Sequence, residues 1–126
     1  MSLATSPSYI ALDVLNERWL PFYAKGGFDR CLAIVDEEVA AKAAPRLAPL
    51  WACIEPCNRL VIPGGEGVKS LSRVEETIDW LLTRSATRST LLVAVGGGAL
   101  LDFVGFVASI YKRGIPCVYV PTTLMA

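Results

Sequence analysis

The sequence predicts an α/β fold in which a parallel sheet lies between layers of helices. Short apolar runs alternate with segments of helical period, and the connections between them are short. The apolar runs are continuous rather than alternating, which is typical of strands buried on both faces. The 126 residues suit one domain, and 53% hydrophobic against 19% charged residues suffice to build a core.

The first half of the chain contains three expected strands and two short helices. Tyr9–Val14 is a short strand, and the apolar run Cys31–Val35 is a strand closed by acidic residues. The composition of Glu37–Ala44 is helical, and a second short helix should begin near Pro45, because proline is favoured in a first turn. Leu60–Ile62 is the third strand.

The clearest helical period follows residue 70. Its apolar residues recur at steps of three and four, namely Leu71, Val74, Ile78 and Leu81. Ser72 and Glu75 fit a capping box, so this helix should begin near Ser72 and end around Arg84.

The last third of the chain contains a strand, a glycine triplet, a helix and a final strand. These are Leu91–Val95, Gly96–Gly98, a helix from about Ala99 to Lys112, and Ile115–Val120. Gly114 is well placed to stop the helix, because glycine readily adopts the backbone conformation of a helix end.

Composition and charge exclude several classes of function. Twelve Lys and Arg balance twelve Asp and Glu, so no long-range field gathers nucleic acid or an anionic membrane, and neither is an expected partner. The absence of histidine removes every histidine-based triad and metal ligand. The apolar run Leu91–Tyr111 holds three glycines and Asp102, which favours a strand, turn and helix over a membrane span.

Features of the cysteines and the termini predict a cytoplasmic protein. Cys31 and Cys117 fall in expected strands, and the C-x3-C pair Cys53 and Cys57 is a weak zinc signal, so buried free thiols are expected. The first residues lack the basic start and apolar stretch of a signal peptide. Because the sequence stops directly after a strand, we expect residues 1–126 to be an N-terminal domain that is incomplete at its C-terminal end.

The glycine triplet favours a phosphate site. Glycines allow close approach of a ligand, and the amides and dipole of a helix start attract a phosphate or pyrophosphate. The spacing differs from the common dinucleotide fingerprint, because Leu101 stands where the third glycine belongs. The alternative is a tight turn that needs glycine for its backbone angles alone.

Two acidic residues are further candidates for the same ligand. Asp36 follows a buried strand, the position from which acidic residues hold a ribose hydroxyl, although it could simply cap the next helix. Asp102 lies one turn into a helix among apolar residues, where an ionised carboxylate is costly unless a donor reaches it. It could hold a ligand hydroxyl or cap nearby backbone.

Five other polar residues are candidates at loops and element ends. Glu66 and Lys69 share a glycine-rich loop and could pair with one another or with a cofactor. Thr122 and Thr123 follow the last strand, where their hydroxyls could hold ribose or phosphate or cap a helix. Arg113 suits the C-terminal end of a helix dipole, and its planar fork could also hold a phosphate or carboxylate.

Four blocks of the sequence together carry a family resemblance. They are V-D-E-E-V at 35–39, P-G-G-E-G-V-K-S at 63–70, G-G-G-A-L-L-D-F-V-G-F-V-A-S-I-Y-K-R-G at 96–114, and V-P-T-T-L at 120–124. They resemble the 3-dehydroquinate synthase family of sugar-phosphate cyclases. The match runs from about Cys31 to the end and covers the front part of a full-length member; together the blocks are specific, although each alone is weak.

The resemblance implies the Rossmann-like NAD domain of that family, without its helical C-terminal domain. It implies that NAD is bound by Asp36, Glu66, Lys69, Gly97, Gly98, Asp102, Thr122 and Thr123. It also implies that Arg113 reaches a substrate phosphate across a homodimer interface. The divalent metal, zinc or cobalt, and the catalytic residues would belong to segments absent from this chain, which agrees with its lack of histidine.

The implied activity is that of a 3-dehydroquinate synthase, an NAD- and metal-dependent carbon–oxygen lyase. It converts 3-deoxy-arabino-heptulosonate 7-phosphate to 3-dehydroquinate with loss of phosphate, in the shikimate route to chorismate and the aromatic amino acids. The alternatives are a sedoheptulose 7-phosphate cyclase of the valiolone or gadusol type, and a nucleotide-binding module without catalysis. The sequence departs from the family pattern at Glu38, where many members have Asn, and at Leu101, where Gly is common.

Overall fold

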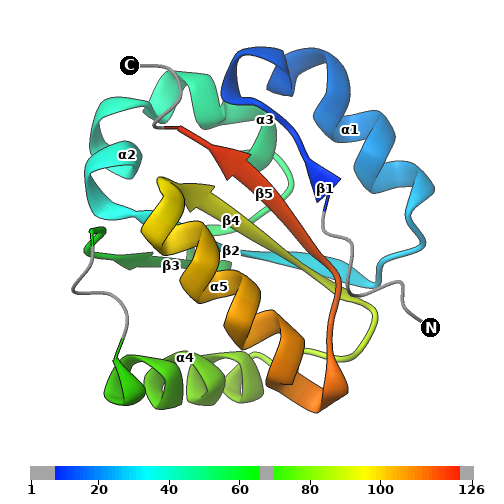
Figure 1. Ribbon diagram of the computed structural model, residues 1–126. Coiled ribbons are helices and arrows are strands. Elements are labelled where there is room, and N and C mark those ends of the chain that lie inside the picture. Colours follow the sequence, from blue (N-terminus) through cyan, green and yellow to red (C-terminus); the bar gives the residue numbers. More distant parts are fainter. Residues whose placement is uncertain (1–7, 66–69, 123–126) are drawn as a thin grey trace.

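Five parallel strands form one sheet in the computed structural model, which describes residues 8–65 and 70–122 (Figure 1). The strand order is β1-β5-β4-β2-β3, and every neighbouring pair is parallel. The strands are β1 (Ser8–Tyr9), β2 (Arg30–Asp36), β3 (Arg59–Ile62), β4 (Thr90–Gly96) and β5 (Cys117–Pro121). The predicted parallel α/β architecture is confirmed.

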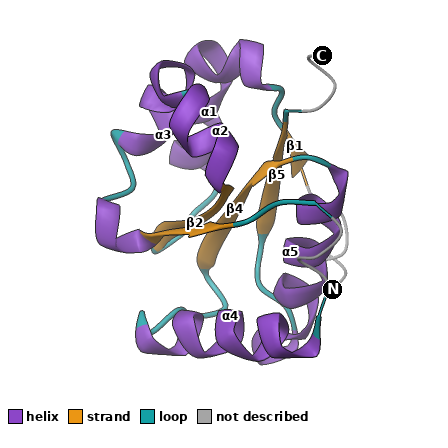
Figure 2. Ribbon diagram, turned by 90° about the vertical axis from the view of Figure 1, so that its left-hand side faces the viewer, coloured by secondary structure: helices purple, strands orange, loops and turns teal. Residues whose placement is uncertain are grey.

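Helices cover both faces of the sheet (Figure 2). One layer holds α1 (Leu15–Lys25), α2 (Glu37–Lys42) and α3 (Ala48–Trp51), and the other holds α4 (Leu71–Thr83) and α5 (Gly98–Ile110). Each layer closes its own apolar cluster against the sheet. Leu32 and Ile34 of β2 point to the α4–α5 layer, whereas Ala33 and Val35 point to the other layer.

The two central strands explain the continuous apolar runs in the sequence. All seven residues of β4 and the five inner residues of β2 are buried. Because successive side chains point to opposite faces, both faces of these strands require apolar residues. Burying one such Val, Leu or Ile side chain contributes about 1.5–3 kcal/mol, so these strands anchor the domain.

The N-terminal segment differs from its prediction. Of the expected strand Tyr9–Val14, only Tyr9 lies in β1, and Leu12–Val14 forms a 3-10 turn that leads into α1. No element was predicted where α1 lies. Pro21 stands inside this helix and normally argues against one, but the burial of Leu15 and Trp19, four residues apart, holds the helix on the sheet.

The helices of the middle segment follow the prediction with shifted ends. α2 ends at Lys42, and the second helix expected near Pro45 is a 3-10 turn, Ala44–Leu47, followed by α3. The predicted cap of α4 is wrong by two residues, because the Ser70 hydroxyl accepts a hydrogen bond from Arg73 N at 3.1 Å. Leu71, the first apolar residue of the predicted period, is 84% exposed at the first position of α4.

The C-terminal segment confirms the order of strand, glycine turn, helix and strand. α5 begins at Gly98 and ends at Ile110, and a 3-10 turn, Tyr111–Arg113, follows. Gly114 has φ 113°, so the expected glycine stop is confirmed. β5 begins at Cys117 rather than Ile115. Within residues 8–65 and 70–122, no helix has both the length and the apolarity to cross a bilayer.

All four cysteines are free thiols, as expected, but only Cys31 is fully buried, and Cys57 is exposed. Burial raises the pKa of the Cys31 thiol to about 11 and that of Cys117 to about 12. Both thiols are therefore protonated near neutral pH and poor nucleophiles.

Asp29, Thr87 and Thr90 form a hydrogen-bonded cluster, here called the clamp, at the amino edge of the sheet. We expect this clamp to make the stability of the domain sensitive to acid. Asp29 accepts from the hydroxyls of Thr87 at 2.5 Å and Thr90 at 2.9 Å. Burial alone would raise the pKa of Asp29, but these hydroxyls and the neighbouring Arg30 hold it below the usual 3.8. Because the folded-state pKa is lowered, the stabilisation is present above the unfolded value and is lost as pH falls through the folded one.

We therefore expect Asp29→Asn to lower the free energy of unfolding by at most about 1 kcal/mol near neutral pH, because Asp29 is exposed and solvent weakens the clamp, and by progressively less as pH falls below the ordinary aspartate pKa of 3.8. Urea denaturation across this range measures the difference. Asp79→Asn changes an exposed carboxylate on α4 and is the control. An Asp29→Asn penalty that does not change with pH would show that the clamp does not depend on the charge.

Candidate functional site

The carboxyl ends of the inner strands meet at one edge of the sheet. In the strand register, Asp36 lies beside Ile62, and Gly96 lies beside Pro121. α2 leaves β2 towards one face of the sheet, and α5 leaves β4 towards the other. Since β2 and β4 are neighbours, the chain diverges between them, and this is where open parallel sheets bind ligands.

The glycine triplet opens α5 without a side-chain cap. Gly97 is the N-cap residue, and the first helical hydrogen bond runs from Leu101 N to Gly97 O at 3.0 Å. The amides before Leu101 therefore have no partner within the helix, as at any helix start. A Cβ placed on Gly98 would meet no neighbouring atom of the described residues within 4 Å, so the space beside Gly98 is open among them.

The backbone angles bear on the alternative interpretation of the triplet as a tight turn. Gly97 has φ −86°, and the glycines with positive φ in the described residues lie elsewhere. The triplet is thus not needed for a left-handed turn. At Gly96, a Cβ would come within 3.2 Å of Leu100 and 3.4 Å of the Asp36 Cβ. Gly96 therefore allows the close packing of Leu100 and Asp36, and the phosphate interpretation of the triplet stays a prediction.

Asp36 caps α2, as the alternative interpretation held. Its Oδ1 accepts from Glu38 N at 2.7 Å and from Val39 N at 3.3 Å. Its Oδ2 lies against Gly64, where a Cβ would overlap it. One carboxylate oxygen is thus used by the helix, while the other lies against the glycine turn that follows β3.

Gly64 is a site residue that the sequence analysis missed. A signal was available, because Gly64 and Gly65 follow an expected strand after a single residue, Pro63. Of these two glycines, only Gly65 has a positive φ, of 83°. Gly64 is therefore required for the close contact with the Asp36 carboxylate and not for its backbone angles. Gly64 and Gly96 together leave the room that the Asp36 side chain occupies.

Asp102 and Thr122 flank the glycine triplet. Asp102 is exposed rather than enclosed by its apolar neighbours, so the desolvation cost expected from the sequence does not arise. It faces a groove of about 430 Å³ between the first turns of α4 and α5, lined by Ser70, Leu71, Val74, Phe103 and Phe106. Thr122 is half-buried and donates its backbone N–H to Gly96 O at 3.0 Å.

The remaining candidates do not join this cluster in the described residues. Arg113 is exposed at the far end of α5, at the amino edge of the sheet. The 13 residues of α5 separate it from Gly97 by about 20 Å, at about 1.5 Å per residue. Glu66, Lys69 and Thr123 lie outside the described residues.

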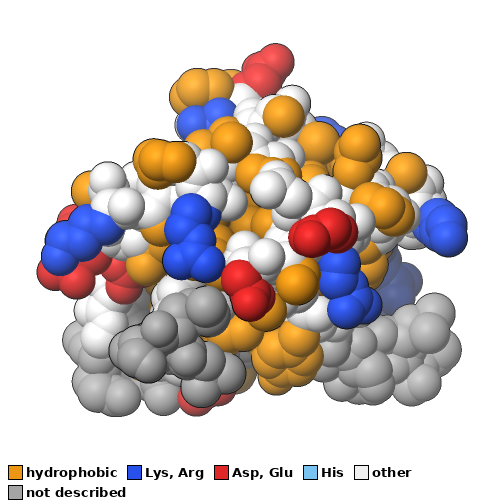
Figure 3. Space-filling model, turned by 90° about the horizontal axis from the view of Figure 1, so that it is seen from above, with side chains coloured by type: hydrophobic (Ala, Val, Ile, Leu, Met, Phe, Trp, Pro, Cys, Tyr) orange, Lys and Arg blue, Asp and Glu red, His pale blue; other side chains and the backbone are white. Residues whose placement is uncertain are grey.

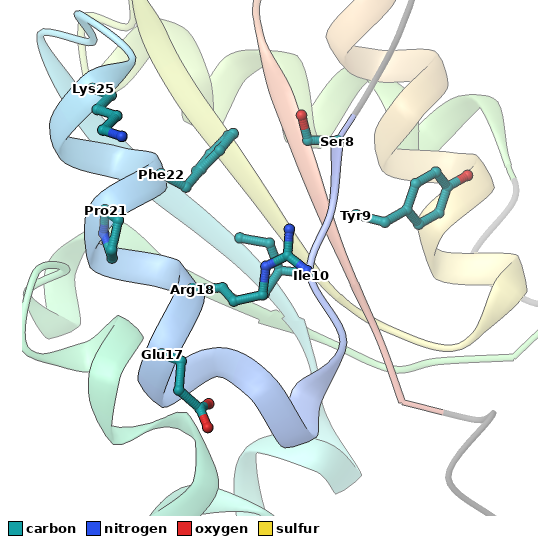
Figure 4. A pocket seen from close by; sticks show the side chains of 8 residues that line it. All are labelled: Ser8, Tyr9, Ile10, Glu17, Arg18, Pro21, Phe22 and Lys25. Atoms are coloured by element: carbon teal, nitrogen blue, oxygen red, sulfur yellow. The ribbon is translucent and has the colours of Figure 1, made fainter.

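A second groove lies between β1 and α1, with a volume of about 490 Å³. Figure 4 shows Arg18 reaching across it towards Ile10, while Glu17 points away from that position and Tyr9 points to the opposite side. Its polar groups do not converge on one point, so we assign it no function.

One face of the surface and the candidate metal donors can be described directly. Seen from above, basic and acidic side chains are interspersed among apolar ones rather than gathered into a field of one sign (Figure 3). Among residues 8–65 and 70–122, no group of three Cys, Asp or Glu side chains is arranged to hold a metal ion. The weak zinc signal of Cys53 and Cys57 therefore has no support.

Comparison with known sequences points to one family. The sequence model described as 3-dehydroquinate synthase N-terminal matches residues 59–126. The 3-dehydroquinate synthase of Staphylococcus aureus (strain JH9) is 37% identical over 99 residues, which are 79% of this chain. The chain spans 28% of the length of that curated relative.

Two solved structures share the fold. A 2-epi-5-epi-valiolone synthase from Streptomyces hygroscopicus subsp. jinggangensis 5008, with NAD+ and Zn2+ bound, gives a TM-score of 0.72 at 28% identity, over 95% of this chain and 33% of its own. A 2-deoxy-scyllo-inosose synthase complexed with carbaglucose-6-phosphate, NAD+ and Co2+ gives a TM-score of 0.69 at 27% identity. The match covers 90% of this chain and 32% of that structure's chain.

The contact between Gly64 and Asp36 yields a stability prediction. Gly64→Ala should lower the free energy of unfolding by about 1 kcal/mol, because the new methyl displaces the carboxylate that caps α2. Gly98→Ala is the matched control, since its methyl enters open space. Thermal or urea unfolding measures both. Equal stability of the two variants would show that the cap does not depend on the glycine contact.

Proposed function

The chain belongs to the 3-dehydroquinate synthase family, and from this premise we propose that its domain binds NAD in the crevice between β2 and β4. The observation that carries the proposal is the uncapped start of α5, with open space in front of Gly98, at the point where the helices diverge. Such a start accepts a pyrophosphate through backbone amides and the helix dipole. The solved relatives that share the fold contain NAD+.

The residues of the crevice fit the parts of this cofactor. The amides of the Gly97–Gly98 turn would hold the pyrophosphate, and the Asp36 Oδ2 lies at the strand end from which carboxylates hold ribose. Asp102 on α5 would offer a carboxylate to the cofactor, and Thr122, whose backbone N–H binds Gly96 O, would offer a hydroxyl. Glu66, Lys69 and Thr123 complete the proposed set by resemblance to the family.

For the whole protein we propose the 3-dehydroquinate synthase reaction, in which a sugar phosphate cyclises with loss of phosphate. NAD supplies a transient oxidation of a substrate hydroxyl. By resemblance to the family, a divalent metal, zinc or cobalt, would hold the substrate, and residues 8–65 and 70–122 provide no ligand set for it. This chain would bind and orient the cofactor, and it would contribute no catalytic residue.

Arg113 has a separate place in the proposal. Its distance from the glycine triplet within one copy is consistent with a contact to substrate phosphate in a second copy of the protein. A homodimer would then be needed for a complete substrate site. Arginine suits this role because its planar fork binds phosphate oxygens bidentately.

The second candidate is a cyclitol synthase that acts on a different sugar phosphate. The observation in its favour is the likeness to two solved cyclases of that kind, at 27% and 28% identity. The family match over residues 59–126 and the 37% identity to a 3-dehydroquinate synthase favour the first candidate.

An assay of the full-length gene product discriminates between these candidates. We expect NAD-dependent phosphate release from 3-deoxy-arabino-heptulosonate 7-phosphate and none from sedoheptulose 7-phosphate. The reverse pattern would identify a cyclitol synthase, and release from neither would favour a nucleotide-binding module without catalysis. Product analysis by mass spectrometry confirms which ring has formed.

The proposed pyrophosphate contact predicts a selective loss of NAD binding. Gly98→Ala should weaken NAD affinity on the order of tenfold, because its methyl enters the space in front of the amides and costs about one charge-assisted hydrogen bond. Calorimetric titration of the full-length protein measures the affinity. Thermal unfolding should be unchanged or occur at a slightly higher temperature, because alanine is favoured over glycine in a helix, so a loss of fold cannot explain weaker binding. Unchanged NAD affinity would place the cofactor elsewhere.

A further inference from the structure

The turn that carries Arg113 has a backbone conformation that its sequence does not favour. Lys112 and Arg113 are both exposed and have φ 48° and 69°, and Gly114 follows with φ 113°. Positive φ at both central residues is the pattern of a type I′ turn, where asparagine and glycine are preferred because a larger side chain crowds the backbone. The chain thus keeps two cationic residues where they cost stability, and such strain persists only where the surrounding structure imposes it.

Three hydrogen bonds hold this conformation. Within the turn, Gly114 N donates to Tyr111 O at 2.7 Å. Directly after it, Ile115 N donates to Ala108 O of α5 at 2.9 Å. The third bond comes from a side chain, since the Tyr111 hydroxyl donates to Ala86 O at 2.8 Å. Tyr111 and Ala86 are both buried, so water does not compete for this bond.

The hydroxyl bond connects the turn to a second fixed segment. Ala86 lies in the loop between α4 and β4, and its N–H donates to Leu81 O at 3.0 Å. Leu81 is fully buried in the apolar cluster of the α4–α5 layer. Tyr111 therefore ties the end of α5 to the end of α4, and Arg113 follows two residues after this anchor.

The Arg113 side chain is available to an anion. It is exposed, and no carboxylate of residues 8–65 and 70–122 forms an ion pair with it. An arginine on a backbone that is fixed beforehand loses less binding energy to ordering when its ligand arrives. A fixed backbone also limits the directions of the planar guanidinium fork, whose bidentate contact with phosphate depends on orientation.

Resting on the proposed function, we propose that Tyr111 is a positioning residue for the substrate-phosphate contact of Arg113. The bond from its hydroxyl to Ala86 O fixes the strained turn before the substrate arrives. Tyr111 itself does not touch the substrate, because it is buried in the apolar cluster of the α4–α5 layer. Without the hydroxyl, the turn relaxes towards the negative φ that lysine and arginine prefer, and the guanidinium has to be ordered on binding.

The test measures steady-state kinetics of the full-length protein with 3-deoxy-arabino-heptulosonate 7-phosphate. Tyr111→Phe keeps the buried ring and removes the hydroxyl. It should lower kcat/KM for this sugar phosphate on the order of fivefold, and Arg113→Ala should lower it at least on the order of tenfold. The affinity for NAD, measured by calorimetric titration, should not change, because α5 separates the turn from the glycine triplet.

Two further variants separate positioning from a structural role. Thr77→Val, in the middle of α4, removes another buried hydroxyl, which donates to Arg73 O at the same distance of 2.8 Å. It should lower the unfolding temperature about as much as Tyr111→Phe does, but it should leave kcat/KM unchanged. In an Arg113→Ala background, Tyr111→Phe should cause no further loss of kcat/KM, because it acts only through Arg113.

Several results would overturn the inference. An unchanged kcat/KM in Tyr111→Phe would show that the hydroxyl bond does not position Arg113. An equal loss in Thr77→Val, or a full additional loss in the Arg113→Ala background, would show that Tyr111 acts through stability alone. If the wild type does not turn over this sugar phosphate, or if Arg113→Ala changes nothing, the proposed function fails and this inference with it. A loss in Arg113→Ala with none in Tyr111→Phe refutes the inference alone.

Discussion

Burial of β2 and β4 on both faces is the constraint from which the rest of the domain follows. Strands whose side chains are apolar on both sides must be covered by helices on both sides. The helix that leaves β2 covers one face, and the helix that leaves β4 covers the other. Adjacent strands whose helices diverge leave a crevice at their carboxyl ends. The position of the candidate site is therefore a consequence of how the core is closed.

Within that crevice, the space left by the missing side chains of the glycines determines where the Asp36 side chain lies. Gly64 and Gly96 lie against the Asp36 side chain, and Gly98 faces open space. None of these contacts requires a positive φ at Gly96 or Gly98, so the glycines act through the side chain they lack. A carboxylate and a helix start can then face one ligand from two neighbouring strands.

The parts of the structure that could be predicted from sequence are those set by local pattern. The apolar runs gave β2, β3 and β4, and the glycine triplet correctly marked the start of α5. The sequence analysis predicted no helix at α1, where Pro21 contradicts local helix propensity. The packing of Trp19 outweighs that propensity, and it depends on residues that are far away in the chain. The cap of α4 was placed at Ser72 because only Ser72 has a glutamate three residues later, yet the hydroxyl that caps the helix belongs to Ser70.

The candidate site shows the same limit. Sequence position alone could not tell whether Asp36 caps a helix or faces a ligand; in the structure its two oxygens have different surroundings, so the alternatives are not exclusive.

The position of Arg113 has a consequence for any ligand that the crevice binds. α5 joins the glycine triplet to the 3-10 turn that holds Arg113, and a helix of 13 residues keeps its ends about 20 Å apart. An arginine side chain is too short to span that distance along the outside of its own helix. Within one copy, Arg113 therefore cannot touch a group bound at Gly98. If substrate reacts beside the cofactor, the proposed phosphate contact of Arg113 requires the crevice of a second copy, and without such a copy Arg113 serves only the C-terminal end of α5.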